Sequence, residues 1–92
     1  MMPKASAWKV PTNGNITYRL QIDGIARGDK KAVHAATEGW KQCGDGWNPS
    51  KKTEIIIFER SFDTYYGFQK WKKSFPWELF VDKDTRGRKP KK

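Results

Sequence analysis

Aromatic and basic side chains are interleaved in the last third of the chain, in a pattern that could hold a polyanion. Eight of the thirteen aromatic residues lie between Phe62 and Phe80, together with Lys70, Lys72 and Lys73. Aromatic rings can stack on bases, and ammonium groups attract phosphates. This composition is therefore typical of a nucleic-acid-binding surface.

A basic segment follows directly, at residues 83–92. It holds six Lys or Arg and one Asp, which gives +5 of the chain's net charge of +9 and leaves +4 for residues 1–82. A segment with so few apolar side chains cannot bury a core, so we expect a disordered tail. Its affinity for a polyanion would be largely electrostatic. The residues expected to contact phosphates are Arg86, Arg88, Lys89, Lys91 and Lys92.

The run Arg86-Gly87-Arg88-Lys89-Pro90 resembles the AT-hook, a short peptide whose Arg-Gly-Arg-Pro core lies in the minor groove of A·T-rich DNA. The match covers five residues, and Lys89 stands between the second arginine and the proline. The resemblance implies that Arg86 and Arg88 enter a narrow groove of enhanced negative potential, with the lysines on phosphates. It favours DNA over RNA. Plain phosphate attraction and a solubilising or targeting tail stay open as alternatives, and no family resemblance is evident for residues 1–82.

The length and composition of residues 1–82 indicate one compact domain. Hydrophobic residues are 36% of the chain, but each aromatic side chain can bury roughly 150–250 Å². Cys43 and His34 are the single cysteine and histidine, so neither a disulfide nor a structural zinc site is expected. No apolar run reaches the roughly 18 residues of a membrane span, and no signal peptide is recognisable. We expect a cytoplasmic, nucleoid- or nucleus-associated protein without a cofactor.

Alternation of apolar and polar residues predicts the strands. The segment from Ile16 to Asp23 alternates over its whole length, which predicts a strand. Asn13-Gly14 predicts a hairpin that joins it to a preceding strand around Trp8–Val10. We expect this preceding strand at a sheet edge, because Pro11 has no N–H to donate to a neighbouring strand. A short strand is expected at Ile25–Arg27. Apolar residues on both faces of Thr53–Arg60 predict a central strand. A last short strand is expected at Trp77–Val81.

Two helices are predicted between these strands. Asp29 caps the first, which is expected to run to about Gln42 with Val33, Ala36, Trp40 and Cys43 on its buried face. The turn-forming residues of 43–52 predict a loop in which Trp47 closes over the core. The alternative is that Trp47 stands exposed as a contact residue. Ser61 or Asp63 caps the second helix, which ends before Pro76.

The second helix carries a candidate binding surface. Helical spacing places Phe68, Trp71 and Phe75 on one face, expected to be buried. The opposite face would then present a tyrosine flanked by lysines, suited to a stacked base with phosphates beside it. The alternative is that the tyrosine half-buries its ring and the lysines only keep the helix soluble. The residues of this second face are Phe62, Tyr66, Lys70 and Lys73, of which Tyr66, Lys70 and Lys73 form the candidate site.

The predicted fold is a small single α+β domain, with a mostly antiparallel sheet of three to four strands packed on two helices. If both helices pack on the same side, Thr17, Arg19 and Gln21 line an uncovered sheet face. Some proteins read nucleic acid with such a face, so Arg19 and Gln21 are further candidates. The order of the strands stays open.

Catalysis is not expected. The carboxylates Asp23, Glu54, Glu59 and Asp63 show no metal-ligand spacing, and His34 lacks a nucleophile partner in a recognisable motif. The sequence therefore predicts a non-enzymatic nucleic-acid-binding protein with no metal. The alternatives are an adaptor or inhibitor that docks on an acidic or nucleic-acid-handling protein through Trp47, Tyr66 or Trp77, and a small RNA-associated protein. Single- against double-stranded preference and oligomeric state stay open.

Overall fold

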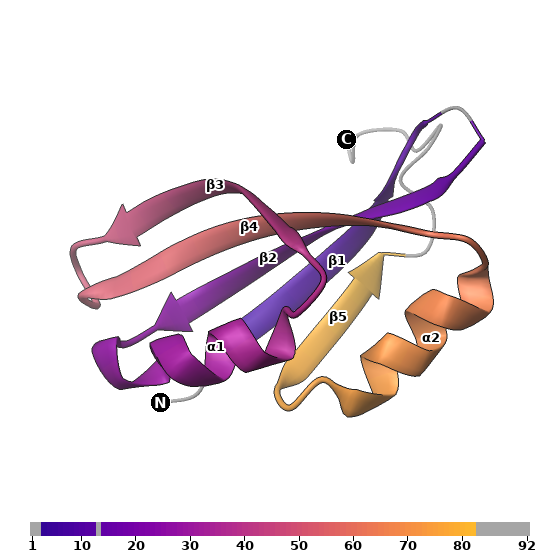
Figure 1. The fold of residues 1–92 in the computed structure, drawn as a ribbon. Coiled ribbons are helices and arrows are strands. Elements are labelled where there is room, and N and C mark those ends of the chain that lie inside the picture. Colours follow the sequence, from indigo (N-terminus) through magenta and orange to yellow (C-terminus); the bar gives the residue numbers. More distant parts are fainter. Residues whose placement is uncertain (1–2, 13, 83–92) are drawn as a thin grey trace.

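Two long antiparallel strands, β2 (Ile16–Ile25) and β4 (Thr53–Phe62), form the centre of the sheet. The strand β1 (Lys4–Val10) pairs with the other side of β2, and β3 (Lys41–Asn48) pairs with the other side of β4. The last strand, β5 (Glu78–Asp82), lies beside β1 and runs parallel to it. The sheet is therefore mixed, with the strand order β3-β4-β2-β1-β5 (Figure 1).

Two helices cover one face of this sheet. A 3-10 turn (Arg27–Asp29) leads into α1 (Lys30–Ala36), and α2 (Tyr65–Ser74) connects β4 to β5. The buried side chains of the helices, Val33 and Phe68, belong to the same core cluster as the inward side chains of the strands, so both helices lie on one side (Figure 1). The result is a small α+β domain, which the computed structural model describes over residues 3–12 and 14–82.

The alternation predicted for β2 is confirmed. Tyr18, Leu20 and Ile22 point into the core with at most 4% of their surface exposed, while Arg19 and Asp23 lie exposed on the other face. This alternation fixes the register, because a slip of one residue would turn the apolar side chains out into solvent.

The central position predicted for the strand at Thr53–Arg60 is also confirmed, since β4 has a neighbour on each side. Ile56 and Phe58 are buried in the core. Ile55 and Ile57 lie half-buried on the opposite face, which neither α1 nor α2 covers. Ile55 and Ile57 therefore belong to a sheet surface and not to a second core.

The predicted hairpin joins β1 to β2. Gly14 has a φ of 84°, a conformation that glycine adopts without strain. Asn13 lies outside the described residues. The prediction that β1 is an edge strand is wrong, because β5 pairs with it from Lys4 to Trp8. Pro11 follows the last paired residue, so its missing N–H affects only the end of the strand.

The first helix is shorter than predicted, and the loop predicted at 43–52 is largely a strand. Asp29 occupies the N-cap position as expected, but its carboxylate accepts a hydrogen bond from the Ala26 N–H and makes none to α1. The helix ends at Ala36. Gly39 has a φ of 89°, and a Cβ there would lie 2.9 Å from the Arg60 guanidinium, so the chain turns back at this glycine. Trp40 is still buried, but Cys43 is exposed in β3.

Three smaller expectations are corrected as well. The short strand predicted at 25–27 does not exist, because Ile25 ends β2 and Arg27 begins the 3-10 turn. The N-cap of α2 is Thr64, not Ser61 or Asp63, because β4 continues to Phe62. With β3 present, the sheet exceeds the three to four strands predicted. The predicted tail, residues 83–92, lies outside the described residues.

Replacing Phe68 with alanine should unfold most of the protein. The ring is fully buried and stacks on Tyr18, with 3.8 Å between the centroids. Removing such a ring costs about 3–5 kcal/mol, a large part of the stability of a small domain. Denaturant unfolding measures the loss. Phe80→Ala is the matched control, since Phe80 is 67% exposed, and an equal loss in both variants would contradict this packing.

Ionisation of Tyr18 should weaken the fold at alkaline pH. Burial first, and the neighbouring Tyr65 second, raise the pKa of Tyr18 above its ordinary value of 10.0. Above that pH the unfolded chain releases the proton while the folded chain retains it, so the free energy of unfolding falls as pH rises. Tyr18→Phe should lose less stability than the wild type over this range. Parallel curves for the two proteins would show that Tyr18 does not contribute.

Candidate nucleic-acid interface

The outward face of α2 is a surface of tyrosines and lysines. Thr64 starts the helix, since its hydroxyl accepts a hydrogen bond from the N–H of Gly67 at 3.3 Å. Phe68 anchors the inner face in the core. Trp71 packs beside it, and its indole N–H donates a hydrogen bond to the Ala36 carbonyl at 3.1 Å, which joins α2 to the end of α1. These contacts fix which face of α2 meets solvent.

Tyr66 and Lys70 lie together on that outer face. The Tyr66 side chain is 71% exposed, and Lys70 Nζ lies 6.0 Å from the centre of its ring. Lys73 is exposed one turn further along the helix. Tyr65 adds a second ring, 50% exposed. The structure thus brings together the three residues of the predicted helix site.

No carboxylate lies in the sequence between Asp63 and Glu78, so this segment carries a charge of +3 from Lys70, Lys72 and Lys73. All three lysines are exposed, and none forms an ion pair within residues 3–12 and 14–82. Lys72 and Lys73 also lie in the last turn, where the helix dipole favours cations. The α2 surface (Tyr65, Tyr66, Lys70, Lys72 and Lys73) is therefore a positive patch with two exposed rings.

Phe62 does not belong to this patch, contrary to the prediction. It ends β4 and is 6% exposed. Its ring packs edge-on against Tyr18, Trp40 and Phe68, and the Arg60 guanidinium lies 4.6 Å from its centre. The helical spacing that grouped it with Tyr66 does not apply, because Phe62 is in a strand.

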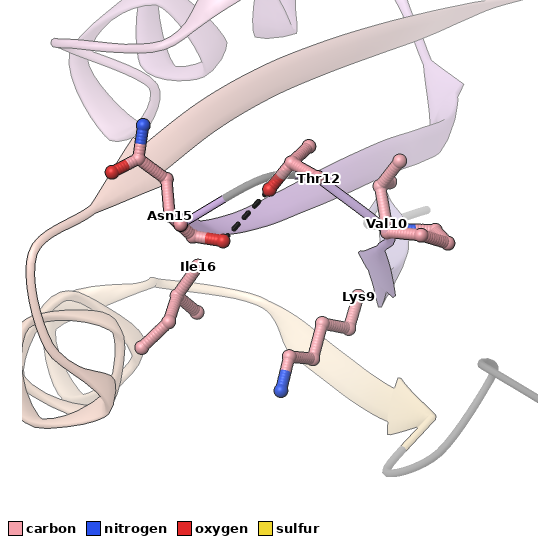
Figure 2. Close-up of a pocket in the computed structure, with 7 residues that line it drawn as sticks. Lys9, Val10, Thr12, Asn15 and Ile16 are labelled. Atoms are coloured by element: carbon pink, nitrogen blue, oxygen red, sulfur yellow. Dashed lines mark hydrogen bonds between the residues drawn. The ribbon is translucent and has the colours of Figure 1, made fainter.

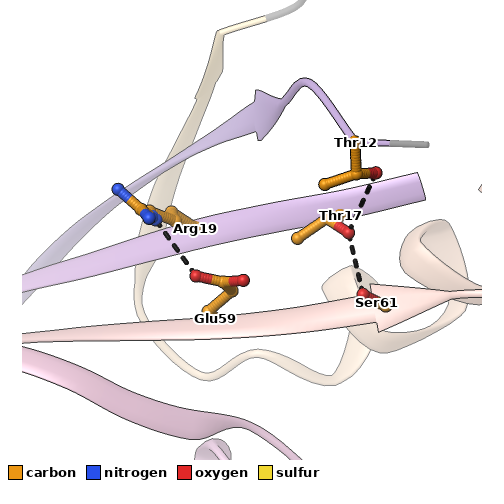
Figure 3. Close-up of polar contacts among 5 residues, drawn as sticks. All are labelled: Thr12, Thr17, Arg19, Glu59 and Ser61. Atoms are coloured by element: carbon orange, nitrogen blue, oxygen red, sulfur yellow. Dashed lines mark hydrogen bonds and ion pairs between the residues drawn. The ribbon is translucent and has the colours of Figure 1, made fainter. Parts of the chain in front are cut away.

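Within the described residues no helix covers the other face of the sheet, as the sequence suggested, but the candidate residue Arg19 on this face is neutralised. Arg19 Nε lies 3.2 Å from a carboxylate oxygen of Glu59 on the neighbouring strand (Figure 3). The Thr17 hydroxyl forms hydrogen bonds with Ser61 at 2.8 Å and with Thr12 at 3.4 Å. Gln21 is half-buried on the same face. The contacts with Glu59 and Ser61 join β2 to β4, and the contact with Thr12 joins β2 to the preceding turn. These are structural roles.

Two aromatic residues on this face were missed by sequence reasoning. Trp8 is half-buried on β1, and Phe80 is 67% exposed on β5. The register pairs Ser6 with Phe80 and Trp8 with Asp82, so the two rings occupy diagonal positions on adjacent strands. The alternation of Ala5, Ser6, Ala7 and Trp8 could have indicated the side of Trp8, but no local pattern shows that β1 and β5 are neighbours.

The charges of the open face nearly cancel. Strand alternation and register place seven charged residues of the described chain on this side, three basic and four acidic. A polyanion would meet no net attraction here. The residues are Lys4, Arg19 and Lys41 against Asp23, Glu59, Glu78 and Asp82.

Trp47 does not close over the core, contrary to the prediction. Its side chain is 60% exposed at the end of β3. It borders a hollow of about 390 Å³ together with Ile25 and the charged side chains of Arg27, Lys30, Lys52 and Glu54. The loop prediction failed because Gly44, Asp45 and Gly46 are turn formers by type, yet here they form an exposed edge strand.

A second hollow, of about 250 Å³, lies beside the β1–β2 turn. Figure 2 shows the hydrogen bond that closes the turn, from the Thr12 hydroxyl to the Asn15 carbonyl at 2.7 Å. Lys9 is the one charged side chain among the described residues that line it, and Lys9 already has an interaction partner. This hollow is explained by the geometry of the turn.

The predicted tail residues Arg86, Arg88, Lys89, Lys91 and Lys92 lie outside the described residues. Asp82, the residue that precedes the tail, is the last described residue. β4 and β5 run in the same direction, because β4 and β1 are both antiparallel to β2 and β5 is parallel to β1. Asp82 therefore lies at the same end of the sheet as Phe62 and the first turn of α2, which carries Tyr65 and Tyr66.

The described carboxylates do not gather into a metal site. Within residues 3–12 and 14–82, no group of three or more His, Cys, Asp or Glu residues could hold a metal ion. Glu54 and Glu59 are each engaged by a basic side chain, Lys30 at 2.8 Å and Arg19 at 3.2 Å. In the same residues, neither helix has the length and apolar character needed to cross a membrane.

Comparisons with protein-family models, with curated proteins and with solved structures found no match to this chain.

Proposed function

We propose that this protein binds nucleic acid without enzymatic activity, and that DNA is preferred over RNA. The observation that carries the proposal is the α2 surface, where three exposed lysines and two exposed tyrosines lie in a segment free of carboxylates. Lysines without ion pairs can neutralise phosphates, and an exposed tyrosine can stack on a base or a sugar. Packing of Phe68 and Trp71 on the other side holds these groups on a rigid helix.

The basic tail would act together with this surface. It begins after Asp82, at the end of the sheet where Tyr65 and Tyr66 lie. Cations on a chain of ten residues can follow a phosphate backbone that also contacts α2. The AT-hook-like run supports DNA as the partner, with Arg86 and Arg88 in the minor groove. A location with the nucleoid or nucleus is part of the same proposal.

A second candidate function is favoured by the open face of the sheet. Trp8 and Phe80 lie there on adjacent strands, and the nearly balanced charges suit a protein surface better than a polyanion. The protein would then be an adaptor or inhibitor, and the charge of +4 on residues 1–82 would steer it to an acidic partner. Such a partner should bind residues 1–82 as tightly as the whole chain and should be lost in Phe80→Ser. The Trp77 anchor considered from the sequence is less suited, since Trp77 packs against the core.

Neutralising α2 should weaken nucleic-acid binding more than the same charge change elsewhere. The test variant is Lys70→Gln, Lys72→Gln and Lys73→Gln combined, and the control is Lys31→Gln, Lys41→Gln and Lys51→Gln, which are exposed outside α2. If each α2 lysine contacts one phosphate, the slope of the logarithm of the binding constant for duplex DNA against the logarithm of the salt concentration should flatten by about 0.9 per lysine. Anisotropy of a labelled duplex over a salt series gives both slopes. Equal losses in the two variants would exclude α2 as the interface.

Removing residues 83–92 should flatten the salt dependence further. Loss of Arg86, Arg88, Lys89, Lys91 and Lys92 removes up to five phosphate contacts, so the slope should change by about 4 to 5 on duplex DNA. Competition among duplex DNA, single-stranded DNA and structured RNA at fixed salt tests the preference for DNA. A wild-type slope near zero, or no binding in dilute buffer, would overturn the proposed function.

A further inference from the structure

The hollow beside Trp47 combines an exposed indole with an apolar floor. Trp47 pairs with Glu54 across β3 and β4, which turns its side chain toward the helix side of the sheet. Ile25, only 1% exposed, ends β2 beneath it. The 3-10 turn and the first residue of α1 form the other wall, through Arg27 and Lys30. The hollow is thus built from two stretches of the chain, residues 25–30 and 47–54.

Two cations in this hollow are uncompensated. Glu54, the one carboxylate among the described residues that line it, is paired with Lys30 at 2.8 Å. The side chains of Arg27 and Lys52 form neither a hydrogen bond nor an ion pair within residues 3–12 and 14–82. An aromatic plane therefore lies beside two free positive groups. Together they suit a ligand that is planar at one end and anionic at the other.

The turn that carries Lys52 is rigid and strained. The Asn48 side-chain carbonyl accepts hydrogen bonds from the N–H groups of Ser50 at 3.1 Å and Lys51 at 3.3 Å. Lys52 has a φ of 56°, the left-handed region that glycine would occupy more easily. A lysine held in that conformation is a candidate for a functional role, because such strain persists where the position is used.

We propose that the Trp47 hollow binds one unpaired nucleotide, with the base stacked on the indole and the phosphate between Arg27 and Lys52. The volume of about 390 Å³ is at the small end for ligand pockets and suits one nucleotide better than a folded partner. Bases within a duplex are already stacked on one another, so the site selects single-stranded segments. The inference deepens the proposed function and rests on it, since it adds the class of nucleic acid that the body of the protein recognises.

The test separates the contribution of the base to binding from that of the phosphates. A short deoxyadenylate strand is compared with an abasic strand of the same length, which has the phosphates but no bases. The indole N–H signal of Trp47, assigned by its loss in Trp47→Phe, should shift with the base-bearing strand and much less with the abasic one. The affinity ratio of the two strands should be about 5- to 100-fold and should fall several-fold in Trp47→Ala, which leaves any base stacking on Tyr66 in place. The Trp47→Phe variant should keep part of the ratio.

The phosphate contact has its own matched pair of variants. Lys52→Gly removes the cation and at the same time relieves the positive φ, so it should fold as well as the wild type. Lys51→Gly removes the neighbouring exposed lysine, which does not line this hollow. Binding of either strand should weaken several-fold in Lys52→Gly and remain near the wild-type value in Lys51→Gly. Equal weakening in both variants would overturn the assigned role of Lys52.

The outcomes distinguish this inference from the proposed function. Equal affinity for the two strands, or no shift of the Trp47 signal, overturns the nucleotide site while nucleic-acid binding through α2 and the tail still stands. In a second experiment AMP alone is added and the Trp47 signal is measured again. A Trp47 shift with AMP but with neither strand would make the hollow a site for a free nucleotide. It would overturn the inference that the hollow recognises nucleic acid, while binding through α2 and the tail would still stand. An acidic peptide without bases that shifts Trp47 as strongly as AMP would also overturn the site.

Discussion

The stack of Phe68 on Tyr18 holds α2 against the sheet. Their rings are nearly parallel, at 3°, with 3.8 Å between centroids, and Trp71 continues the contact to α1. Because α2 lies across the core at this point, the chain can return to the far side of β1 and add β5 in parallel. The same packing turns Tyr66 and the lysines outward. The candidate interface is thus the solvent side of the helix that completes the core.

The Trp47 hollow and the first turn of α2, with Tyr65 and Tyr66, lie at opposite ends of the sheet. β4 begins with Thr53 and Glu54 beside the Trp47 hollow and ends with Phe62, just before α2. The nine residues from Glu54 to Phe62 span about 27 Å, so one extended strand of nucleic acid would have to run along the molecule to reach both. The open sheet face offers no net positive charge for that path. The helix side is therefore the direction in which the two surfaces can act together.

Local patterns predicted the elements whose side chains point to one core. The alternation in β2, the apolar run of β4 and the inner face of α2 are all dictated by burial, and each lies where the pattern indicated. β3 could not be recognised, because an exposed edge strand rich in glycine needs no apolar alternation; its backbone pairing with β4 alone defines it. The pairing of β1 with β5 is equally invisible in local sequence. Helical spacing identified Tyr66, Lys70 and Lys73 of the candidate site. The exposure of Trp47 and the ion pair of Arg19 could not be predicted in this way, because they depend on neighbours that are distant in the sequence.

The parallel pairing of β5 with β1 has a consequence for how the chain folds as it is made. Synthesis delivers β1 first, but the strand that protects its outer backbone groups is the last of the five. Until Asp82 has left the ribosome, β1 presents an unpaired edge next to Ala5 and Ala7, which belong to the core. Contacts between such distant parts of a chain form slowly. A nascent or proteolysed chain that lacks β5 would expose this edge to strand addition from another copy, so aggregation of truncated forms is the hazard that this topology creates.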